Sequence, residues 1–576
     1  METLWELPAP VESQSVRQSF ASGLQVPEVI AAILLRKGIS TRAEAEAFFN
    51  PSPECLNDPF TLRDMEKAVE RTIKAIMERE KILIYGDYDV DGVTSVSLLY
   101  SFLRDMGGEV TYHIPDRSNE GYGLTRDSID AALVQQIDLL ITVDTGITAI
   151  EAISYAQEQG IDVIVCDHHE PASELPPAVA ILDPKCKEDT YCFRELAAVG
   201  VTYKLAQGIS IRLELGDECL EQYIDLVAIG SSADIVPLID ENRIIVKMGL
   251  DKINYDCSIG VEALIRIAGI RKNWLDVNQI VFGMAPRINA VGRMGNAERA
   301  VEMLTTRNRN RALDMARILE TENTRRKAID SKTLKEAHKQ LLENFDQSND
   351  RAIVLYREGW HQGVIGIVAS RLIERYHRPT IMLSITKGIA KGSARSIQGF
   401  DIFQALKECE DLLEQYGGHQ YAAGLSIREE NLPEFERRFK EIAHRDISRS
   451  DLIPRLKIEG VLQLDQIDSE LLNIIRRFAP FGPRNKQIVF ASFGVELLKG
   501  PRHVGGNHLL VQVGQNGAVF NGIGYNLGPL VERIPPGTRF VDVAYTVEEN
   551  EWQGQVNVQL YLKDIREMSP EAPQLT

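Results

Sequence analysis

From about residue 80 to residue 235, short apolar stretches of the sequence alternate with longer stretches of helical pattern. The apolar stretches are rich in Val, Ile and Leu, as expected for strands that are buried on both faces of a sheet. We expect these strands at Lys81–Tyr85, Glu109–Ile114, Leu139–Val143, Asp162–Cys166 and Val179–Leu182. Helices are expected between them, at stretches such as Thr94–Met106 and Ala149–Gln159. This alternation predicts an α/β fold with a mostly parallel sheet and crossover helices.

Three of the predicted strands are followed directly by carboxylate or imidazole side chains. These are Asp87, Asp89 and Asp91 after the first strand, Asp144 after the third, and Asp167, His168 and His169 after the fourth. Ligands of open parallel sheets bind just outside the carboxyl ends of the strands. If the three strands are neighbours, their polar side chains converge at one edge of the sheet. The pattern therefore predicts a shared metal site at that edge.

The stretch DYDVDG at residues 87–92 also matches the start of an EF-hand calcium loop. Such a loop needs a Glu at its twelfth position and a helix on each side. Counted from Asp87, the twelfth position is Leu98, and the preceding residues Lys81–Tyr85 are a predicted strand. Both observations exclude an EF-hand.

Each polar group also has a simpler explanation when it is taken alone. Asp144 is suited to capping a helix N-terminus, and Asp91 to capping the helix that is expected from Thr94. His168 and His169 alone would fit a solvent-exposed pair. Their common position at one edge of one sheet favours the metal site over these separate explanations.

A further aspartate in the stretch DLVAIGSSADIVPL is expected to complete the site. The candidates are Asp225 and Asp234, and we favour Asp234 because the small residues Gly230–Ala233 allow close approach of the backbone. Oxygen-rich ligation with one or two imidazoles suits Mn²⁺ or Mg²⁺, and Zn²⁺ is a weaker fit. Several aspartates would support two ions, and two ions can clamp both oxygens of an in-line phosphoryl displacement.

Composition limits the classes of protein to which the chain can belong. The chain has 576 residues, of which 44% are hydrophobic, so three or four domains with large cores are expected. The formal net charge of −19 argues against nonspecific nucleic-acid binding, although local fields and bound cations can reverse its effect. The seven cysteines form no Cys-x-x-Cys pair, which argues against zinc ribbons and disulfide frameworks and for a reducing cytoplasm. We see no signal peptide in METLWELPAPVESQ and no apolar run of about 18 residues, so no membrane contact is expected.

The rest of the chain divides into three regions. Residues 298–345 are charged and free of Gly and Pro, which predicts a long helix that connects two domains. A second α/β unit is expected at about 350–445, with strands near Ala352–Tyr356 and Thr380–Ser384 and helices near Gly363–Tyr376 and Ile402–Tyr416. Short alternating strands with Gly-rich turns at 455–568 predict a five-stranded barrel of the OB type, with a small β-sandwich as the alternative. Examples of these strands are Gln487–Phe490, His508–Val513, Ala518–Tyr525 and Gln555–Leu562.

Eight motifs occur in a characteristic order along residues 55–430. The first four are GDYDVDGVTS, LLITVDTGI, VIVCDHHEP and AIGSSADIVPL, and the later four are APRINAVGRMG, GWHQGVIGIVASRL, KGSARSIQGF and YGGHQYAAGLSI. With this order the chain resembles the DHH phosphoesterase superfamily and, closely, its RecJ family of single-strand-specific exonucleases. The first four motifs resemble the metal-site motifs of the superfamily, and Asp167-His168-His169 resembles the motif that gives it its name.

The resemblance implies two α/β lobes joined by a long helix, with an active site in the cleft between the lobes and a C-terminal OB-type β-barrel. The implied domains are an N-terminal segment at 1–54, a DHH catalytic domain at 55–305, a connecting helix at 306–348, a DHH-associated domain at 349–448 and an OB-fold nucleic-acid-binding domain at 449–576.

The resemblance also implies roles for the residues at the strand ends. The implied metal ligands are Asp89, Asp91, Asp144, His168 and Asp234. Asp144 is expected to bridge two ions, and Asp87 is either a further ligand or a neighbour of the ligands. His169 is expected to face the scissile phosphate, and Asp167 to orient a histidine. The predicted catalytic residues are thus His169, Asp167 and Asp144.

The second α/β unit offers hydrogen-bond donors for a nucleic-acid strand. Arg395 lies between Ser393 and Ser396 in GSARS, and a planar guanidinium with flanking hydroxyls suits a terminal phosphate. The alternative is a Ser-rich turn with an exposed arginine. Gly418 and His419 combine close backbone approach with an imidazole donor, or else mark the end of a helix. Our hypothesis is that Arg395 and its serines hold the 5′ end of a strand, which would explain exonuclease polarity.

Further DNA-binding residues are expected in loops and in the barrel. The candidates are Arg117, Arg287, Arg293 and His361 near the cleft, and Lys499 and Arg502 near Gly-rich turns of the barrel, where His503 and His508 also lie. For Arg117 the alternative is an exposed loop charge. The aromatic residues Phe490, Phe493, Phe520 and Tyr525 would offer stacking surfaces for a single strand, or else belong to the barrel core.

The leading hypothesis is a metal-dependent 5′→3′ exonuclease that degrades single-stranded DNA to 5′-mononucleotides in DNA repair and recombination. The alternatives are a phosphodiesterase acting on short oligonucleotides or cyclic dinucleotides, an inorganic pyrophosphatase, and a non-catalytic DNA-binding scaffold. We expect a monomer, and the resemblance implies cooperation with a single-strand-binding protein and a helicase.

Overall fold

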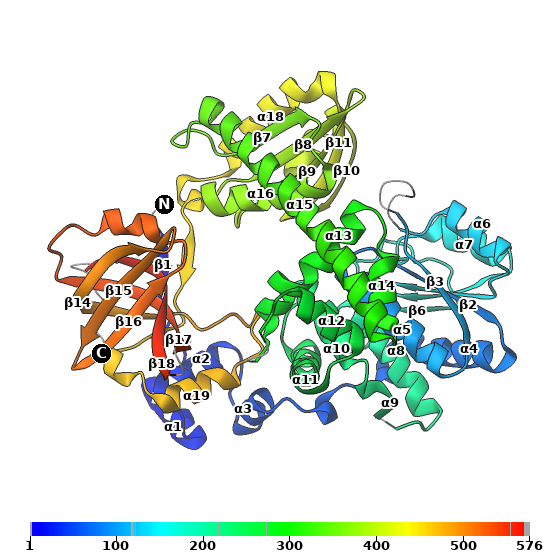
Figure 1. Cartoon of the computed structure of the whole chain (residues 1–576), viewed down its shortest axis with the longest axis horizontal. Helices are drawn as coiled ribbons and strands as arrows, with labels where there is room; N and C mark the ends of the chain where they lie inside the picture. Colours follow the sequence, from blue (N-terminus) through cyan, green and yellow to red (C-terminus); the bar gives the residue numbers. More distant parts are fainter. Residues whose placement is uncertain are drawn as a thin grey trace. The chain divides into compact units, whose positions relative to one another are not determined.

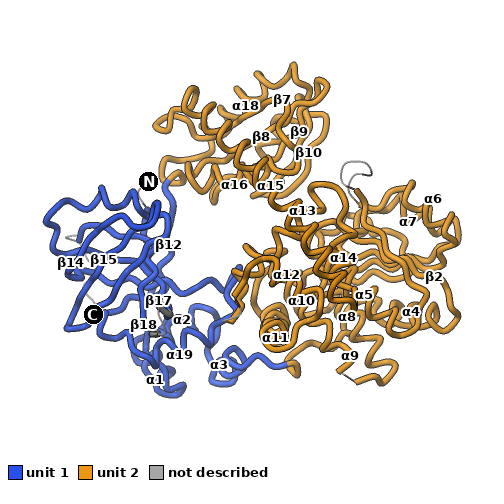
Figure 2. The backbone as a smooth tube through the Cα atoms, in the orientation of Figure 1, with its two compact units in different colours: residues 1–52, 453–576 blue, residues 53–452 orange. Residues whose placement is uncertain are grey.

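The computed structural model of the chain describes residues 3–116, 120, 123–216, 218–271, 274–552 and 555–568. These residues form two compact units, which Figure 2 shows in different colours. Residues 53–452 form the larger unit, and residues 1–52 together with 453–576 form the smaller unit. The described N-terminal residues therefore fold with the C-terminal region and not with the sequence that directly follows them.

The larger unit begins with a five-stranded parallel sheet whose strand order is β3-β2-β4-β5-β6. Its strands are β2 (Lys81–Gly86), β3 (Glu109–His113), β4 (Leu139–Val143), β5 (Asp162–Cys166) and β6 (Ala180–Leu182). All five lie where the sequence predicted strands. Ile82 and Ile84 enter one hydrophobic cluster, whereas Leu83 and Tyr85 enter another. The sheet is therefore buried on both faces, which explains the continuous apolar runs in its sequence.

The strand order creates a topological switch point between β2 and β4. The chain passes from β2 to β3 on one side and then returns to β4 on the other side of β2. In open α/β sheets, ligands bind outside the carboxyl ends of the strands at such a point. Asp87 and Asp89 follow β2, and Asp144 follows β4, so these side chains lie at the place where a ligand is expected.

Helices surround this sheet and complete the first lobe. They are α4 (Met65–Glu78), α5 (Val90–Asp105), α6 (Arg126–Val134), α7 (Ile150–Glu158), α8 (Ala198–Arg212), α9 (Glu218–Glu221), α10 (Ile224–Ala233), α11 (Asp240–Asp256), α12 (Ile259–Ile267), the π-helix η3 (Gln279–Met284), α13 (Ala285–Met294) and α14 (Glu298–Thr305). Gly230 of α10 allows this helix to pack directly on α5, because a Cβ at Gly230 would lie 2.3 Å from the Thr94 hydroxyl oxygen.

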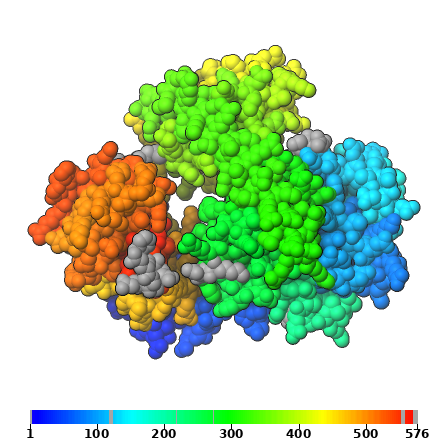
Figure 3. Space-filling model, viewed as in Figure 1, coloured from blue at the N-terminus to red at the C-terminus, as the bar shows by residue number. Residues whose placement is uncertain are grey.

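A long helix, α15 (Arg309–Asn344), connects the first lobe to a second lobe (Figure 1). The sequence predicted helix over residues 298–345, and the structure divides this stretch into α14 and α15. Thr306 is extended between them, and Asn308 starts α15 by accepting hydrogen bonds from the backbone N–H groups of Asn310 and Arg311. In the space-filling view, green atoms form a continuous surface from the first lobe to the second (Figure 3).

The second lobe contains a five-stranded sheet with the order β10-β11-β9-β8-β7, in which only β7 and β8 are parallel. Its elements are β7 (Ile353–Glu358), α16 (Gln362–Tyr376), β8 (Thr380–Thr386), β9 (Ile389–Arg395), α17 (Ile402–Lys407), β10 (Leu413–His419), β11 (Ala422–Arg428) and α18 (Leu432–Asp446). The predicted helix at Ile402–Tyr416 was wrong in its second half, because residues from Leu413 onward pair with β11.

The smaller unit is built around a closed five-stranded barrel. Its strands are β14 (Phe490–Val504), β15 (His508–Gln515), β16 (Ala518–Gly524), β17 (Phe540–Trp552) and β18 (Gln555–Glu567). They pair in the order β14-β15-β16-β18-β17, and β17 pairs back with β14. This closure supports the predicted barrel of the OB type and not the β-sandwich.

Short elements from both ends of the chain pack around the barrel. They are β1 (Leu4–Glu6), α1 (Gln14–Leu24), α2 (Glu28–Arg36), α3 (Arg42–Phe49), β12 (Arg455–Lys457), β13 (Gly460–Val461) and α19 (Ser469–Arg477). Strand β1 pairs in parallel with β12, and the Trp5 indole donates a 2.7 Å hydrogen bond to Asp564 of β18. Ile30 and Leu34 of α2 belong to the same hydrophobic cluster as Phe490 of the barrel.

Among the described residues, no single helix has the length and apolar character needed to cross a membrane. Helices α1 and α2 meet that criterion of length and composition only when they are taken together, and they are bent by 104° against each other.

Candidate functional site

The DYDVDG stretch forms the turn between β2 and α5 together with the first three residues of α5. The helix begins at Val90, four residues before the predicted start at Thr94. Its N-cap is Asp89, whose carboxylate accepts a 3.1 Å hydrogen bond from the backbone N–H of Gly92. The interpretation of Asp91 as the cap of this helix was therefore wrong. A Cβ at Gly92 would lie 2.4 Å from the carbonyl oxygen of Asp87, so the tight turn requires a glycine here.

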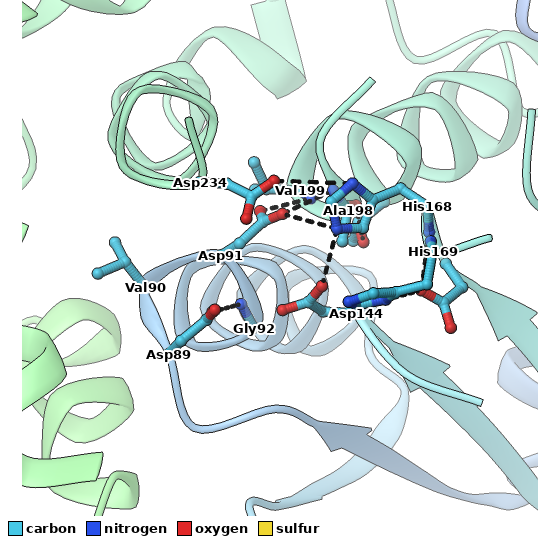
Figure 4. Close-up of polar contacts among 12 residues, drawn as sticks. Asp89, Val90, Asp91, Gly92, Asp144, His168, His169, Ala198, Val199 and Asp234 are labelled. Atoms are coloured by element: carbon cyan, nitrogen blue, oxygen red, sulfur yellow. Dashed lines mark hydrogen bonds and ion pairs between the residues drawn. The ribbon is translucent and has the colours of Figure 1, made fainter. Parts of the chain in front are cut away.

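Asp91 connects the turn to helix α8. Its carboxylate accepts hydrogen bonds from the backbone N–H groups of Ala198 and Val199, at 2.7 and 2.9 Å, and its side chain is fully buried. Both donors lie in the first turn of α8, where backbone N–H groups have no acceptor within the helix and a negative charge is favoured. The hydrogen bonds from α8 fix the Asp91 carboxylate in a position where it faces His168 (Figure 4).

Three carboxylates point toward the His168 imidazole (Figure 4). The Nε2 atom of His168 lies 3.3 Å from Oδ1 of Asp144 and 3.9 Å from Oδ2 of Asp91. Its Nδ1 atom lies 3.7 Å from Oδ2 of Asp234. These side chains come from the ends of β4 and β5, from the start of α5 and from the end of α10. The predicted convergence at one edge of the sheet is present.

Three groups of side chains place possible ligand atoms within 4.8 Å of one another: Asp87 with Asp89 and Asp144, Asp91 with His168 and Asp234, and Asp144 with His168 and His169. The first two groups share no residue, and the 3.3 Å approach of Asp144 to His168 links them. Oxygen atoms with an imidazole nitrogen are a donor set that suits Mn²⁺ or Mg²⁺.

The two alternatives for the last aspartate are placed differently by the structure. Asp234 follows α10 and joins the group around His168. The Asp225 carboxylate instead accepts backbone hydrogen bonds from Leu226 and Ser258, both at 2.8 Å. Asp225 therefore ties α10 to the start of α12.

The pKa values of the clustered groups are strongly shifted. Burial, together with the charge of Asp89, raises the pKa of Asp91 to about 7. Burial and the charges of Asp91 and Asp89 raise the pKa of Asp234 to about 9, and the same kind of environment raises the pKa of Asp144 well above its ordinary value. Burial and the neighbouring His169 lower the pKa of His168 to about 3. Divalent cations would remove the repulsion among these carboxylates, so the donor set fits such ions.

Asp167 positions His169 and does not belong to any of the three groups. Its carboxylate accepts a 2.7 Å hydrogen bond from Nδ1 of His169 and further bonds from the backbone N–H groups of His168 and Ile147. Burial opposes the charge of Asp167, but the hydrogen bond from His169 and the imidazolium charge hold the pKa of this carboxyl below its ordinary value. Burial likewise opposes the charge of His169, yet the bond to Asp167 raises the pKa of this imidazole.

The second lobe gathers the predicted donors at one end of its sheet. Arg395 ends β9, and the sheet register aligns it with Ala422 of β11 and, across that strand, with His419 of β10. The Arg395 guanidinium donates to the Ser393 hydroxyl at 3.0 Å and to the carbonyl oxygen of Ala394. Burial lowers the pKa of Arg395. The alternative of a Ser-rich turn is wrong, because Ser393 and Arg395 lie within a strand.

The other residues of this region occupy defined positions around the strand ends. Ser396 follows β9 and donates to the carbonyl oxygen of Phe400. Gly418 has a φ of +141° inside β10, and a Cβ there would lie 2.4 Å from the carbonyl oxygen of Ala422. His361 is the N-cap of α16, and its Nδ1 accepts a 3.0 Å hydrogen bond from the backbone N–H of Gly363.

Two arginines of α13 make contacts within the protein. Arg287 is 7% exposed and pairs with Glu320 of α15 at 2.5 Å. Arg293 donates from Nη1 to the carbonyl oxygen of Gly363 in α16 at 2.9 Å. Arg117 lies outside the described residues.

In the barrel, Lys499 and Arg502 lie in β14 and are exposed. The structure shows which aromatic residues belong to the barrel core and which are exposed. Phe490 is fully buried and Phe493 is 9% exposed, so both belong to the core, whereas Tyr525 is 53% exposed. Tyr525 lies edge-on against His508, with 5.1 Å between the ring centroids.

Sequence reasoning missed Asp183 and Lys185. Asp183 directly follows β6 and is fully buried, and burial raises its pKa to about 7. The Lys185 ammonium lies 3.6 Å from Glu170, the residue after His169. The signal was available in the stretch AILDPK, because its aspartate follows an apolar strand in the same way as Asp144.

Comparison with known proteins assigns most of the chain. The model of the DHH family, N-terminal domain, matches residues 81–231, that of the DHHA1 domain matches residues 349–445, and that of the RecJ OB domain matches residues 458–564. The chain is 38% identical, over 97% of its length and 70% of the relative's, to the single-stranded-DNA-specific exonuclease RecJ of Bacillus subtilis. The chain belongs to the RecJ family.

Solved structures of RecJ share this fold. RecJ from Thermus thermophilus in complex with Mn²⁺ superposes with a TM-score of 0.84 at 28% identity, covering 99% of this chain and 80% of the other. The complex of the same RecJ with Mg²⁺ superposes with a TM-score of 0.78 at 27% identity, covering 99% and 79% of the two chains. The DHH match contains the clustered residues from Asp87 to His169, and Asp234 lies three residues beyond its end.

Proposed function

We propose that this chain is a metal-dependent exonuclease that degrades single-stranded DNA from the 5′ end and releases 5′-mononucleotides in DNA repair and recombination. The observation that carries the proposal is the cluster of buried carboxylates around His168 at the switch point of the first sheet, in a chain of the RecJ family. Relatives of this family are named single-stranded-DNA-specific exonucleases, and solved RecJ structures hold Mn²⁺ or Mg²⁺.

We further propose that the chain binds two Mn²⁺ or Mg²⁺ ions through Asp87, Asp89, Asp91, Asp144, His168 and Asp234. Two ions are supported by the two groups of three ligands that share no member, with Asp144 as the bridge between them. Such ions, when bound, would supply Lewis-acid chemistry at the phosphodiester. Buried carboxylates with raised pKa values favour cation binding because each cation relieves their mutual repulsion.

His169 is proposed to act on the scissile phosphate from beside the metal ligands. The Asp167 carboxylate accepts from Nδ1, which fixes the ring orientation and favours the imidazolium form. Nε2 then carries a proton that can be donated to a phosphate oxygen as negative charge develops there. Because Asp167 is itself held by backbone N–H groups, His169 is oriented before the substrate binds.

The 5′ end of the strand is proposed to bind at Arg395, with Ser393 and Ser396 beside it. Arg395 carries a partly buried guanidinium whose described hydrogen bonds go to neutral acceptors, so a terminal phosphate would compensate its charge. The sheet register supports a role for His419 at the same end of the sheet. The remaining proposed strand contacts are Arg117, Arg287, Arg293, His361, Gly418, Lys499 and Arg502.

The broader plan of the protein is part of the same proposal. It comprises an N-terminal segment at 1–54, catalytic and associated domains at 55–305 and 349–448, a connecting helix at 306–348 and a nucleic-acid-binding barrel domain at 449–576. We also propose a cytoplasmic monomer that works with a single-strand-binding protein and a helicase.

One parallel assay tests the activity. The protein is incubated with Mn²⁺ or Mg²⁺ and 5′- or 3′-labelled single-stranded DNA, duplex DNA, a cyclic dinucleotide or pyrophosphate, with EDTA as the control. We expect metal-dependent release of mononucleotides from the 5′ end of single strands and little reaction with the others. Hydrolysis of the dinucleotide or pyrophosphate alone, or DNA binding without hydrolysis, would contradict the proposal.

A further inference from the structure

Helix α16 lies between the candidate metal centre and the residues proposed to bind the 5′ end, which are Arg395, Ser393 and Ser396. On the side of the first lobe, a Cβ at Gly292 of α13 would lie 2.3 Å from the carbonyl oxygen of Tyr88, the residue between Asp87 and Asp89. The next residue, Arg293, donates to the carbonyl oxygen of Gly363 in the first turn of α16. A Cβ at Gly363 would in turn lie 3.1 Å from the carbonyl oxygen of Arg293. Close backbone contacts therefore extend from the metal-binding turn to α16.

The next turn of α16 contacts the residues proposed to bind the 5′ end. A Cβ at Gly366 would lie 2.8 Å from the Ser393 hydroxyl oxygen and 3.2 Å from Nη2 of Arg395. The glycine allows the helix to approach the guanidinium directly. Any displacement of α16 would therefore displace Arg395 or remove the surface against which it packs.

An ion pair holds α16 against the connecting helix. Nη2 of Arg371 in α16 lies 3.1 Å from Oδ2 of Asp330 in α15. The Asp330 side chain is 1% exposed, whereas that of Arg371 is 44% exposed. Arg326, one turn earlier on α15, is also buried. Burial raises the pKa of Asp330, and the charges of Arg371, Arg326 and Arg293 oppose that rise. Moving Arg371 away would remove the largest of these opposing charges, so the pair resists movement of α16 along α15.

We propose that Arg371 and Asp330 are positioning residues for the exonuclease reaction. They hold α16, and through Gly366 the Arg395 guanidinium, at a set distance from the metal centre. That distance determines how many nucleotides separate the bound 5′ end from the cleaved phosphodiester, and thus the length of the released product. This inference rests on the proposed function.

The test compares two arginines on the same helix. Arg371→Ala removes the pair with Asp330. The matched control is Arg375→Ala, one turn further along α16, whose side chain contacts His338 at 3.3 Å and not Asp330. The full chain is given a 5′-phosphorylated single strand labelled near its 5′ end, and the first products are separated by length. Rates are measured over a range of strand concentrations.

For Arg371→Ala we expect kcat to fall roughly 10- to 100-fold, because a misplacement of about 1 Å has effects of this size. KM should change less than kcat, and dinucleotides should appear beside mononucleotides. Arg371→Lys, which keeps the charge, should restore mononucleotide release, and Arg375→Ala should resemble the wild type. Asp330→Asn should reproduce the altered product length, and combining it with Arg371→Ala should add little.

Two results would overturn the positioning role. One is unchanged rate and product length in Arg371→Ala. The other is a fall in both melting temperature and rate with mononucleotides as the sole product, since that pattern indicates a purely structural contribution. A wild-type protein that degrades no strand would instead overturn the proposed function itself.

Discussion

The ends of the two sheets in the larger unit hold buried or partly buried charges of opposite sign. At the first sheet, burial and mutual repulsion raise the pKa values of Asp91, Asp144 and Asp234. At the second sheet, burial lowers the pKa of Arg395, whose described hydrogen bonds go to a hydroxyl and a carbonyl oxygen. Burying a charge without compensation is costly, so each region favours a bound partner of opposite sign. Divalent cations suit the first region and a terminal phosphate suits the second.

The opposite charges predict that metal binding and recognition of the strand end can be changed independently of each other. The acidic region should respond to metal ions, and the basic region should respond to the chemistry of the strand end. Substitutions in each region should therefore change different measurable quantities.

The largest effect is expected from Asp144→Asn. Loss of the proposed bridging carboxylate should reduce single-strand degradation by about 10³-fold or more. Without metal, the variant should unfold at the same or a higher temperature, because the buried repulsion with Asp89 and Asp91 is relieved. Metal at about 100 times its dissociation constant should stabilise the wild type by ~2.7 kcal/mol, and the variant much less. Melting curves with and without Mn²⁺ measure both effects.

The exposed Asp127→Asn in the first turn of α6 is the matched control for loss of one carboxylate. If Asp144→Asn keeps either full activity or the full metal-dependent rise in melting temperature, the acidic cluster is not the metal site.

His169→Ala should lower kcat by about 10²- to 10⁴-fold, the range for a lost general acid. Asp167→Asn should lower kcat about 10- to 100-fold, since the imidazole stays but its orientation and charge are less well held. In both variants the metal-dependent rise in melting temperature should remain near that of the wild type. If His169→Ala abolishes that rise, His169 binds a metal ion and does not serve only as the proton donor.

In the basic region, Arg395→Ala should lower kcat/KM for 5′-phosphorylated strands about 10- to 100-fold, because one charge-assisted contact is lost. For 5′-hydroxyl strands the change should be much smaller. Arg428→Ala serves as the control, since Arg428 lies on β11 of the same sheet and pairs with Glu414. If the wild type degrades 5′-phosphorylated and 5′-hydroxyl strands equally, and Arg395→Ala changes neither rate, Arg395 does not bind the 5′ end.

The smallest effect is expected from the barrel. Replacing both Lys499 and Arg502 by Ala should weaken binding to long strands a few-fold and reduce the logarithmic salt slope by about 1.4, or about 0.7 per lost contact. Hydrolysis of short oligonucleotides should be unaffected. Lys457→Ala with Arg539→Ala removes two exposed charges elsewhere in the smaller unit and is the control. Equal salt slopes for the two double variants would argue against strand binding at β14.

Local patterns predicted the first sheet well. The predicted bounds of β4 and β5 agree with the structure, because fully buried parallel strands produce continuous apolar runs that end where polar residues begin. The prediction at Ile402–Tyr416 failed in its second half for the opposite reason. Leu406, Leu413 and Tyr416 are compatible with a helical pattern, and only pairing with the distant strand β11 selects the extended conformation.

Long-range contacts explain the other differences. Arg287 is part of a motif that suggests strand binding, and its ion pair with Glu320 of another helix could not be read from that motif. Asp91 is an apparent helix cap in the sequence, and its hydrogen bonds go to α8, more than 100 residues away. No local pattern encodes such partners.

Local sequence patterns were sufficient to predict where the strands of the first sheet end and which polar residues follow them, because strand burial leaves its signal over a few neighbouring residues. Which strands are neighbours, and how the helices approach them, became known from the folded structure alone. It placed β2 beside β4, which brings Asp89 and Asp144 together, and packed α10 onto α5 through Gly230, which brings Asp234 to His168. These contacts depend on packing between segments far apart in the chain, so the carboxylates and His168 come together only where that packing is complete.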